Sequence, residues 1–289
     1  MYKPKISIIT AVYNRADKIE QCISSVVSQT YDNIEYIVID GGSADGTVDV
    51  IKKYADKIAY WCSEPDKGIY DAWNKGLVHA TGDYVNFIGS DDAMYGDDAV
   101  QNIAGYLTDD VDVLAGNLCV IEEKSKFEHL SANESVKNKQ EYQGGCIATQ
   151  GTFVRRELCN KYGFDTSYKV AADYKFFLQY YYDGKTKIKF VDDVVQYFSN
   201  DGISGDANYD FVRNEDNRAY KELGLLNLVD CHVRQREADD NRGIKALCKT
   251  LGVFYPVKLF YHAHIKKDWH RHHCSNKICR WCGMGGVRE

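Results

Sequence analysis

Short apolar runs alternate with amphipathic segments along the first hundred residues. The runs are rich in Ile, Val, Tyr and Phe, as buried strands are, and the segments between them carry apolar residues at helical spacing. This pattern predicts strands at 5–10, 34–40, 58–63 and 83–89, with helices over 19–27, 47–55 and 68–80. Strands joined by helical crossovers indicate an α/β fold with a mainly parallel central sheet flanked by helices.

Beyond residue 110 the alternation is less regular. Residues 111–121 predict another strand, whereas 122–145 are polar and are expected to form a mobile excursion. The pattern predicts a helix over 171–182 and one or two strands over 188–198. From residue 208 onward the chain is expected to be mainly helical.

Composition adds little to this picture except the expected class. The chain has 289 residues, of which 44% are hydrophobic and 27% charged, as in soluble globular proteins. No stretch approaches the roughly 20 apolar residues that span a bilayer, and the first residues lack a signal-peptide layout. Most of the ten cysteines are scattered singly and are expected to be reduced core residues. We therefore expect a cytoplasmic protein.

Charge is unevenly distributed along the chain. From Lys258 onward seven Lys and Arg face two acids, a net charge of +5, whereas the whole chain carries −6. The 257 residues before Lys258 therefore carry −11. An acidic body suits cation binding, and a basic tail suits an anionic surface. No nucleic-acid partner is expected.

Small or polar residues follow all four predicted N-terminal strands, and three of the four strand ends also carry carboxylates. They are TAVYN (10–14), DGGS (40–43), SEPD (63–66) and SDD (90–92). Ligands of open α/β sheets bind at the carboxyl ends of the strands. The adjacent carboxylates of Asp91 and Asp92 repel each other, so a cation is expected near them, although a solvated turn would also accommodate the pair.

The sequence resembles glycosyltransferase family 2 in two stretches. These are residues 6–47, ISIITAVYNRADKIEQCISSVVSQTYDNIEYIVIDGGSADGT, and residues 66–92, DKGIYDAWNKGLVHATGDYVNFIGSDD. The resemblance is specific over 5–95 and thinner to about 205. It implies a GT-A fold with a catalytic domain over 1–205, divided into a nucleotide-sugar part (1–110) and an acceptor part (111–205), and a helical basic segment over 206–289. It also implies inverting, metal-dependent transfer from a nucleotide diphosphate sugar.

The resemblance implies that Asp40 contacts the nucleoside, usually uridine. By residue type alone, Asp40 also suits a turn in which it bonds its own backbone. The helix that contains YDAWNKG would lie near the diphosphate and sugar, although it could equally be a solvated face. The implied nucleotide- and donor-binding residues are Thr10, Ala11, Tyr13, Asn14, Asp40, Gly42, Ser43, Asp66, Lys67, Asp71, Asn74, Lys75, Ser90 and Asp91.

The SDD sequence resembles the metal-binding DxD-type motif of the family. The resemblance implies that Asp91 faces the ribose or the metal and that Asp92 ligates Mg²⁺ or Mn²⁺ bound to the diphosphate. Carboxylate oxygens are hard ligands that suit both ions. Such a cation neutralises the charge that develops on the leaving diphosphate.

An inverting transferase needs a carboxylate that takes the proton of the acceptor hydroxyl. The resemblance implies that this base follows a Gly-Phe-Asp element at a helix start, and Gly163-Phe164-Asp165 followed by Asp173 matches. Many members have Glu-Asp where this chain has Ala172-Asp173, and an Asp at a helix start also serves as a cap.

Two further segments carry weaker resemblances. Gln150 resembles an acceptor- or sugar-side residue of the polysaccharide subgroup, although Thr149 replaces the His that often precedes it. Residues 200–206 resemble a loop that closes over the diphosphate.

The tail admits alternative interpretations. Residues 257–273 have an apolar stripe flanked by Lys and Arg, which suits a helix on an anionic membrane or a helix packed on the catalytic domain. Cys274, Cys279 and Cys282 could bind zinc with a nearby His, but their spacing is irregular, and unligated thiols remain the alternative.

These features together predict a glycosyltransferase with a GT-A fold that uses Mn²⁺ or Mg²⁺. Its donor would be a nucleotide sugar, UDP-linked by preference, and its acceptor a glycan or polyprenol-linked glycan of bacterial surface polysaccharide or lipopolysaccharide. A sugar-nucleotide pyrophosphorylase is the alternative enzyme, but AVYNRADK lacks the Gly-rich triphosphate loop expected of one. An inactive sugar-nucleotide-binding scaffold is the non-enzymatic alternative.

Overall fold

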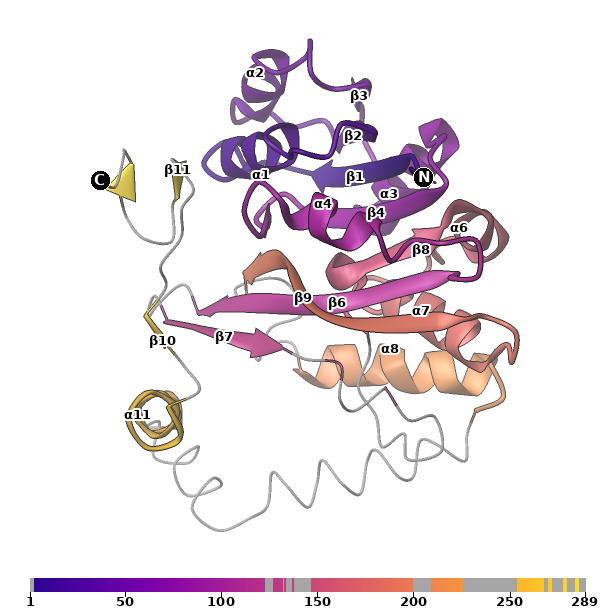
Figure 1. Cartoon of the computed structure of the whole chain (residues 1–289), viewed down its shortest axis with the longest axis vertical. Helices are drawn as coiled ribbons and strands as arrows, with labels where there is room; N and C mark the ends of the chain where they lie inside the picture. The colour runs from indigo at the N-terminus through magenta and orange to yellow at the C-terminus, as the bar shows by residue number, and fades with distance from the viewer. Residues whose placement is uncertain are drawn as a thin grey trace.

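The computed structural model (Figure 1) describes residues 3–122, 127–131, 133, 137, 147–199, 209–225, 254–267, 270–271, 278–279 and 284–285. Ten of the described strands form one sheet, in the order β10-β7-β6-β8-β4-β1-β2-β3, with β5 and β9 attached beside this path. Helices cover both faces. The predicted α/β class with a central sheet is confirmed.

The first half of the sheet is built as predicted. Its elements are β1 (Ile6–Val12), α1 (Ile19–Val27), β2 (Ile34–Asp40), α2 (Thr47–Lys52), β3 (Tyr60–Ser63), α3 (Ile69–His79) and β4 (Tyr84–Gly89). The four strands are parallel in the order β3-β2-β1-β4. Alternate side chains of each strand enter two cores, one under α1, α2 and α4 and the other under α3, α7 and α8.

The second half of the sheet is mixed. It contains β5 (Ala93–Met94), α4 (Ala99–Ala104), β6 (Val113–Glu122), β7 (Phe127–Ser131), the 3-10 turn η1 (Thr149–Gly151), β8 (Thr152–Arg155), α6 (Arg156–Tyr162), α7 (Ala172–Tyr182) and β9 (Ile188–Ser199). β8 is antiparallel to β4 and β6, and β9 runs parallel to β6. Because β7 pairs along β6, part of the polar stretch 122–145 belongs to the sheet, and the excursion expected there is wrong for 127–131.

The helix α8 (Tyr209–Glu222) lies beyond the boundary expected at residue 205, yet it packs into the main core. Its Ala219 and Tyr220 are buried with the aromatic residues of α7. In Figure 1 α8 runs beneath α7 and β9. This contact places α8 against the segment that carries Asp173.

The described part of the C-terminal segment contains short strands beside its helices. α11 (Phe254–Phe260) continues into the π-helical turn η3 (Tyr261–Lys266), which ends where Lys267 adopts a left-handed backbone (φ 58°). The predicted helix over 257–273 is therefore interrupted, and β10 (His270–Arg271) pairs with the edge of β7. β11 (Ile278–Cys279) and β12 (Met284–Gly285) form a separate pair. None of the described helices has the length and apolar composition that a membrane crossing requires.

Candidate active site

The carboxyl ends of the four parallel strands lie side by side. Asp40 of β2 is in register with Val12 of β1 and with Ser63 of β3, while Gly89 of β4 is in register with Ala11. The loops after these strands therefore leave the same edge of the sheet, as the sequence predicts. We call this edge the strand-end rim; it consists of residues 12–15, 40–46, 63–68 and 89–92.

Two loops of the strand-end rim are joined by hydrogen bonds around Asn14. This residue has a left-handed backbone (φ 48°), and its N–H donates to Ser43 Oγ at 2.7 Å. The side-chain Oδ1 of Asn14 accepts from the N–H of Ala44 at 3.0 Å. The neighbouring Tyr13 is 60% exposed, so its ring is available to a planar ligand. Three of the predicted donor-binding residues thus lie together.

Asp40 is fully buried, and both of its carboxylate oxygens accept hydrogen bonds from the protein. Ser43 Oγ donates to Oδ1 at 2.5 Å, and Ser63 Oγ donates to Oδ2 at 2.6 Å. The N–H groups of Gly42 and Ser43 also donate to Oδ2, at 3.1 and 2.9 Å. The carboxylate therefore holds the turn after β2, as a turn-forming Asp does, and Gly42 is exposed to solvent in that turn.

Three other predicted donor-binding residues are buried in or beside the sheet. Thr10 is fully buried, and its hydroxyl lies 3.0 Å from the hydroxyl of Tyr36. The hydroxyl of Thr10 therefore belongs to the core and not to the surface of the strand-end rim. Ala11 and Ser90 are also buried, so little of either side chain reaches solvent.

The loop between β3 and α3 packs closely on the turn after β2. A Cβ at Gly41 would lie only 2.5 Å from Oδ2 of Asp66, so the glycine makes room for this carboxylate. Asp66 also accepts a hydrogen bond from the N–H of Gly68 at 2.8 Å, and Asp71 accepts one from the N–H of Lys67 at 3.0 Å. The carboxylates of Asp66 and Asp71 thus hold the backbone at the start of α3.

Lys75 lies one helical turn further along α3 and reaches back toward the strand-end rim. Its ammonium is 3.0 Å from the carboxylate of Glu64 and donates to the carbonyl of Pro65 at 2.9 Å. Asp71 lies 3.9 Å away on the same helix. A phosphate at this ammonium would have to compete with two carboxylates.

Asp91 and Asp92 meet at the end of β4. A Cβ at Gly89 would lie 2.6 Å from Oδ2 of Asp92 and 3.1 Å from Oδ1 of Asp91, so the glycine lets both carboxylates approach the strand end. Asp92 is only 3% exposed and accepts from the N–H groups of Gly89 (3.2 Å) and Ser199 (2.9 Å). Asp91 is half-buried.

A divalent cation fits this pair of carboxylates only with further ligands. Among the described residues, no group of three or more Asp, Glu, His or Cys side chains could hold a metal ion. Mg²⁺ and Mn²⁺ sites, however, commonly use one or two carboxylates plus phosphate oxygens and water. A carboxylate oxygen has two lone pairs, so a backbone hydrogen bond to it does not by itself exclude a metal ion. The oxygen donors at Asp91 and Asp92 therefore suit an ion that arrives with a diphosphate.

The Gly-Phe-Asp element is fastened to α3. Asn74 Nδ2 donates to the carbonyl of Phe164 at 2.7 Å, and the N–H of Phe164 donates to Asn74 Oδ1 at 3.0 Å. The ring of Phe164 lies in an aromatic cluster with Tyr70, Trp73, Phe87 and Phe176. We call residues 163–175 the base segment. The amide of Asn74, predicted to bind the donor, is bonded to this segment.

Asp173 lies in the first turn of α7 and is held by the same helix. The hydroxyl of Tyr70 donates to Asp173 Oδ1 at 2.9 Å, and the N–H of Tyr174 donates to the same oxygen at 3.0 Å. Burial raises the pKa of Asp173 above its ordinary value, the two hydrogen bonds oppose this, and the negative charge of Glu215 adds to it. A raised pKa makes a carboxylate a stronger base once it is ionised.

A family model described as Glycosyl transferase family 2 matches residues 7–163, which is more than half of the chain. The chain belongs to glycosyltransferase family 2. Its match begins in β1 and ends at Gly163, so it includes the whole strand-end rim and stops where the base segment begins.

Curated relatives of this family match parts of the chain. An uncharacterized glycosyltransferase of Mycobacterium tuberculosis is 45% identical over 98 residues, which are 34% of this chain and 37% of the relative. A PGL/p-HBAD biosynthesis glycosyltransferase of Mycobacterium bovis is 29% identical over 182 residues, 61% of this chain and 69% of the relative. The alignment thus spans little more than a third of the first of these relatives.

Solved structures of glycosyltransferases share the fold at low identity. Staphylococcus aureus TarS 1–349 superposes with a TM-score of 0.61 at 19% identity, over 91% of this chain and 82% of TarS. The mannosyltransferase PcManGT of Pyrobaculum calidifontis gives a TM-score of 0.56 at 19% identity, over 90% and 81% of the two chains. The predicted GT-A fold of this family 2 member is confirmed.

Other predicted parts of the family 2 site are only partly described. Gln150 lies in η1, where its carbonyl accepts from Asn86 Nδ2 at 3.0 Å, and its acceptor-side role stays a prediction. The loop 200–206 lies outside the described residues, as do Cys274 and Cys282 of the proposed zinc site.

Sequence reasoning missed three residues that hold the family 2 site together. Tyr70 lies four residues before Asn74, so both face the base segment from one side of α3, and helical spacing could have suggested this. Glu215 and Ser199 contact the site from distant parts of the chain. No local signal in the sequence points to these two contacts.

Proposed function

We propose that this protein is an inverting glycosyltransferase that transfers a sugar from a nucleotide diphosphate donor, a UDP-sugar by preference, to a hydroxyl of a glycan or lipid-linked glycan. Its solved neighbours support the donor class, because TarS 1–349 has been solved with UDP-GlcNAc and PcManGT with GDP-Man and Mn²⁺. The open edge of the strand-end rim, with Tyr13 and Asn14, would receive the nucleoside and diphosphate.

The observation that carries this proposal is the support of Asp173. A carboxylate with a raised pKa is fastened by Tyr70 to the helix that leaves the strand-end rim. A base held beside a donor site is what transfer requires and what simple nucleotide binding does not. In the reaction the acceptor oxygen bonds to the anomeric carbon from the face opposite the leaving group. Asp173 takes the hydroxyl proton, and the bond to the nucleotide diphosphate breaks with its electron pair.

Asp91 and Asp92 would hold Mg²⁺ or Mn²⁺ on the donor diphosphate. Such an ion supplies neutralisation of the charge that develops on the departing diphosphate. The protein's own part is to keep both carboxylates at the end of β4, through Gly89 and the N–H of Ser199.

The test is a transfer assay with a panel of nucleotide sugars in Mn²⁺, comparing the wild type with Asp173→Asn. The amide keeps the size of the side chain but cannot take the proton, so transfer should fall by about 10²–10⁴-fold while nucleotide binding is kept. The anomeric configuration of the product, read by NMR, tests inversion. Transfer at the wild-type rate by Asp173→Asn would refute the base assignment.

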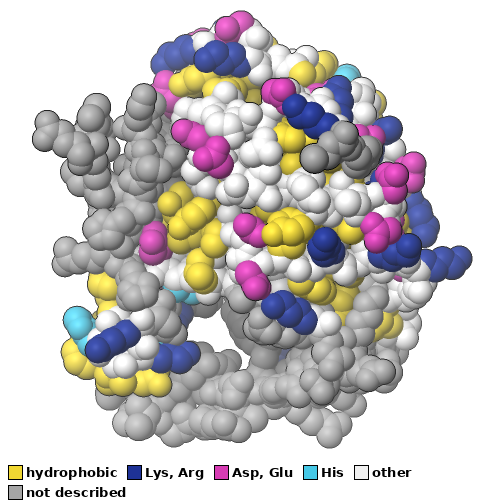
Figure 2. Space-filling view, in the orientation of Figure 1, with side chains coloured by type: hydrophobic (Ala, Val, Ile, Leu, Met, Phe, Trp, Pro, Cys, Tyr) yellow, Lys and Arg dark blue, Asp and Glu magenta, His cyan; other side chains and the backbone are white. Residues whose placement is uncertain are grey.

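We also propose that the C-terminal segment rests on an anionic membrane, as a cytoplasmic peripheral protein with a lipid-linked acceptor would. Figure 2 shows apolar and basic side chains side by side over α11 and η3 at the lower left. The exposed apolar residues are Phe260 (59%), Tyr261 (46%) and Ile265 (63%), and the adjacent cations are Lys258, Lys266 and Lys267.

Sedimentation with vesicles tests this contact. Binding should require anionic lipid and should weaken with salt, because exposed charges are screened within about 8 Å at physiological ionic strength. Replacement of Phe260 and Ile265 by Ser should release the protein, whereas Tyr106→Ser, an exposed aromatic elsewhere, should not. Equal binding to neutral vesicles would contradict the proposal.

A further inference from the structure

The helix that carries the base begins without a capping side chain of its own. Its N-terminal residues are Ala171 and Ala172, and no side chain of the cap residue bonds the first turn of α7. The first N–H groups of a helix have no partner within the helix and need acceptors from elsewhere. Just before Asp173, the backbone presents three successive N–H groups, those of Lys169, Val170 and Ala171.

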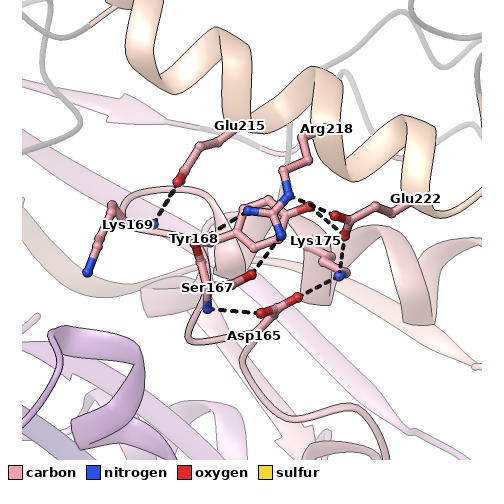
Figure 3. A network of polar contacts seen from close by, with 8 residues as sticks. All are labelled: Asp165, Ser167, Tyr168, Lys169, Lys175, Glu215, Arg218 and Glu222. Atoms are coloured by element: carbon pink, nitrogen blue, oxygen red, sulfur yellow. Dashed lines mark hydrogen bonds and ion pairs between the residues drawn. The ribbon is translucent and has the colours of Figure 1, made fainter.

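Glu215 of α8 binds the N–H of the cap residue Ala171 and those of the two residues before it. Its Oε2 accepts from the N–H of Lys169 (3.0 Å), Val170 (2.8 Å) and Ala171 (3.0 Å), and its Oε1 accepts from Lys169 at 2.8 Å. The carboxylate is buried, so these charge-assisted bonds are shielded from water. Figure 3 shows Glu215 reaching down from α8 to the loop before α7.

A second group of contacts joins the C-terminal end of α8 to the base segment. Glu222 Oε2 accepts from Lys175 Nζ at 2.6 Å and from the hydroxyl of Tyr168 at 2.8 Å. Arg218 Nη2 donates to Ser167 Oγ at 2.7 Å, and Lys175 also pairs with Asp165 at 2.8 Å. In Figure 3 these contacts lie at the other end of the helix from Glu215.

We propose that Glu215 is a positioning residue for the base Asp173: from another helix it holds the cap residue of α7 and the loop before it, and thereby sets the direction in which the first turn presents the Asp173 carboxylate. This inference rests on the proposed function. It gives α8 a role in catalysis, although no residue of α8 is proposed to react or to contact a ligand.

The experiment compares Glu215→Ala and Glu215→Gln in the full chain, alone and combined with Asp173→Asn. Alanine removes all of the acceptors, whereas glutamine keeps one oxygen at the same reach. We expect kcat for transfer to fall by about 10- to 100-fold in Glu215→Ala and by less in Glu215→Gln, because small misplacements of a catalytic group have effects of this size. The KM for the donor should stay near the wild-type value.

The combined variants separate positioning from general damage to the fold. Once Asp173 has lost its base function, moving it should cost little more, so Glu215→Gln should barely slow Asp173→Asn further. The matched control is Glu222→Gln, another carboxylate of α8 that bonds Tyr168 and Lys175. It should lower the melting temperature but keep kcat, because Lys175 keeps Asp165 as its partner.

Three results would overturn the inference: wild-type kcat in both Glu215 variants, an equal loss in the Asp173→Asn background, or an equal loss of kcat in Glu222→Gln. If Glu215→Ala does not fold, Glu215→Gln carries the same comparisons. A failure of the proposed function is seen elsewhere, because Asp173→Asn alone would then transfer sugar at the wild-type rate.

Discussion

The strand-end rim and the base segment are held in place in different ways. Asp40 in the rim is bonded by Gly42 and Ser43, its near neighbours in the chain, and by Ser63 of the adjacent strand. The base segment is bonded by α3, about 90 to 100 residues before it, and by α8, more than 40 residues after it. The position of the strand-end rim therefore follows from sheet register, whereas the position of the proposed base Asp173 depends on contacts with two helices.

This difference predicts which substitutions act directly and which act through position. Changes in the strand-end rim should affect the donor and its metal. Changes in α3 and α8 should affect turnover with the donor still bound. Three experiments test that division.

The largest effect is expected at the carboxylates of β4. Asp92→Asn should lower transfer by about 100-fold or more, because a metal ion supplies several kcal/mol to the transition state and each 1.36 kcal/mol is tenfold. Chelation by EDTA should abolish activity, and Mn²⁺ should restore it. Since Asp92 is buried and accepts hydrogen bonds from Gly89 and Ser199, the melting temperature of the Asp92→Asn protein should also fall.

Asp91→Asn is the matched variant for this test, because Asp91 is half-buried at the same strand end. It should lose activity with a smaller loss of stability. Full activity of the wild type in EDTA would remove the metal from the proposal.

A smaller effect is expected for Asn74, where two roles can be told apart. Asn74→Ala leaves the N–H and carbonyl of Phe164 without their partner, which should cost about 1–3 kcal/mol in the free energy of unfolding. Urea denaturation measures this cost, with the exposed Asn160→Ala as control. If Asn74 serves the base segment, kcat falls while the Kd for the nucleotide is unchanged. A raised Kd with unchanged stability would return Asn74 to the donor site.

The sequence predicted the strand-end rim well because its signals are local. Buried strands have a recognisable pattern, and parallel strands bring their carboxyl ends to one edge, so Asp40 and Asp91 could be placed near each other from periodicity alone. What could not be read was the direction of each side chain. The hydroxyl of Thr10 points into the core, and the carboxylate oxygens of Asp40 accept hydrogen bonds from Ser43 and Ser63.

In the base segment the sequence predicted which residue would be the base but not the contacts that hold it. The resemblance identified Asp173, and the pattern predicted its helix, but the partners of both lie far away in the sequence. Glu215 belongs to a polar helix, and the periodicity of that helix does not predict which backbone N–H groups Glu215 binds. The structure of the tail could not be predicted either. Its apolar stripe predicts a helix and gives no sign of the left-handed backbone at Lys267 or of the pairing of β10 with β7.

The smallest effect is expected for Tyr70→Phe, which tests the hydrogen bond from α3 to the proposed base. The phenylalanine keeps the ring among Trp73 and Phe164 and removes only the hydroxyl that donates to Asp173. That hydrogen bond stabilises the ionised carboxylate and lowers its pKa, against burial, which raises it. Its loss should raise the pKa further.

Because the proposed base Asp173 must be ionised to take a proton, the acidic limb of the pH profile of kcat should move to higher pH in Tyr70→Phe. Above that limb Asp173 is ionised in both proteins, so the loss should stay at about tenfold or less, since a hydrogen bond contributes about 0.5–1.5 kcal/mol net and each 1.36 kcal/mol is tenfold. Tyr106→Phe, far from the base, should leave the limb unchanged. A limb that stays in place, or moves to lower pH, would mean that the group titrating in kcat is not Asp173 bonded to Tyr70.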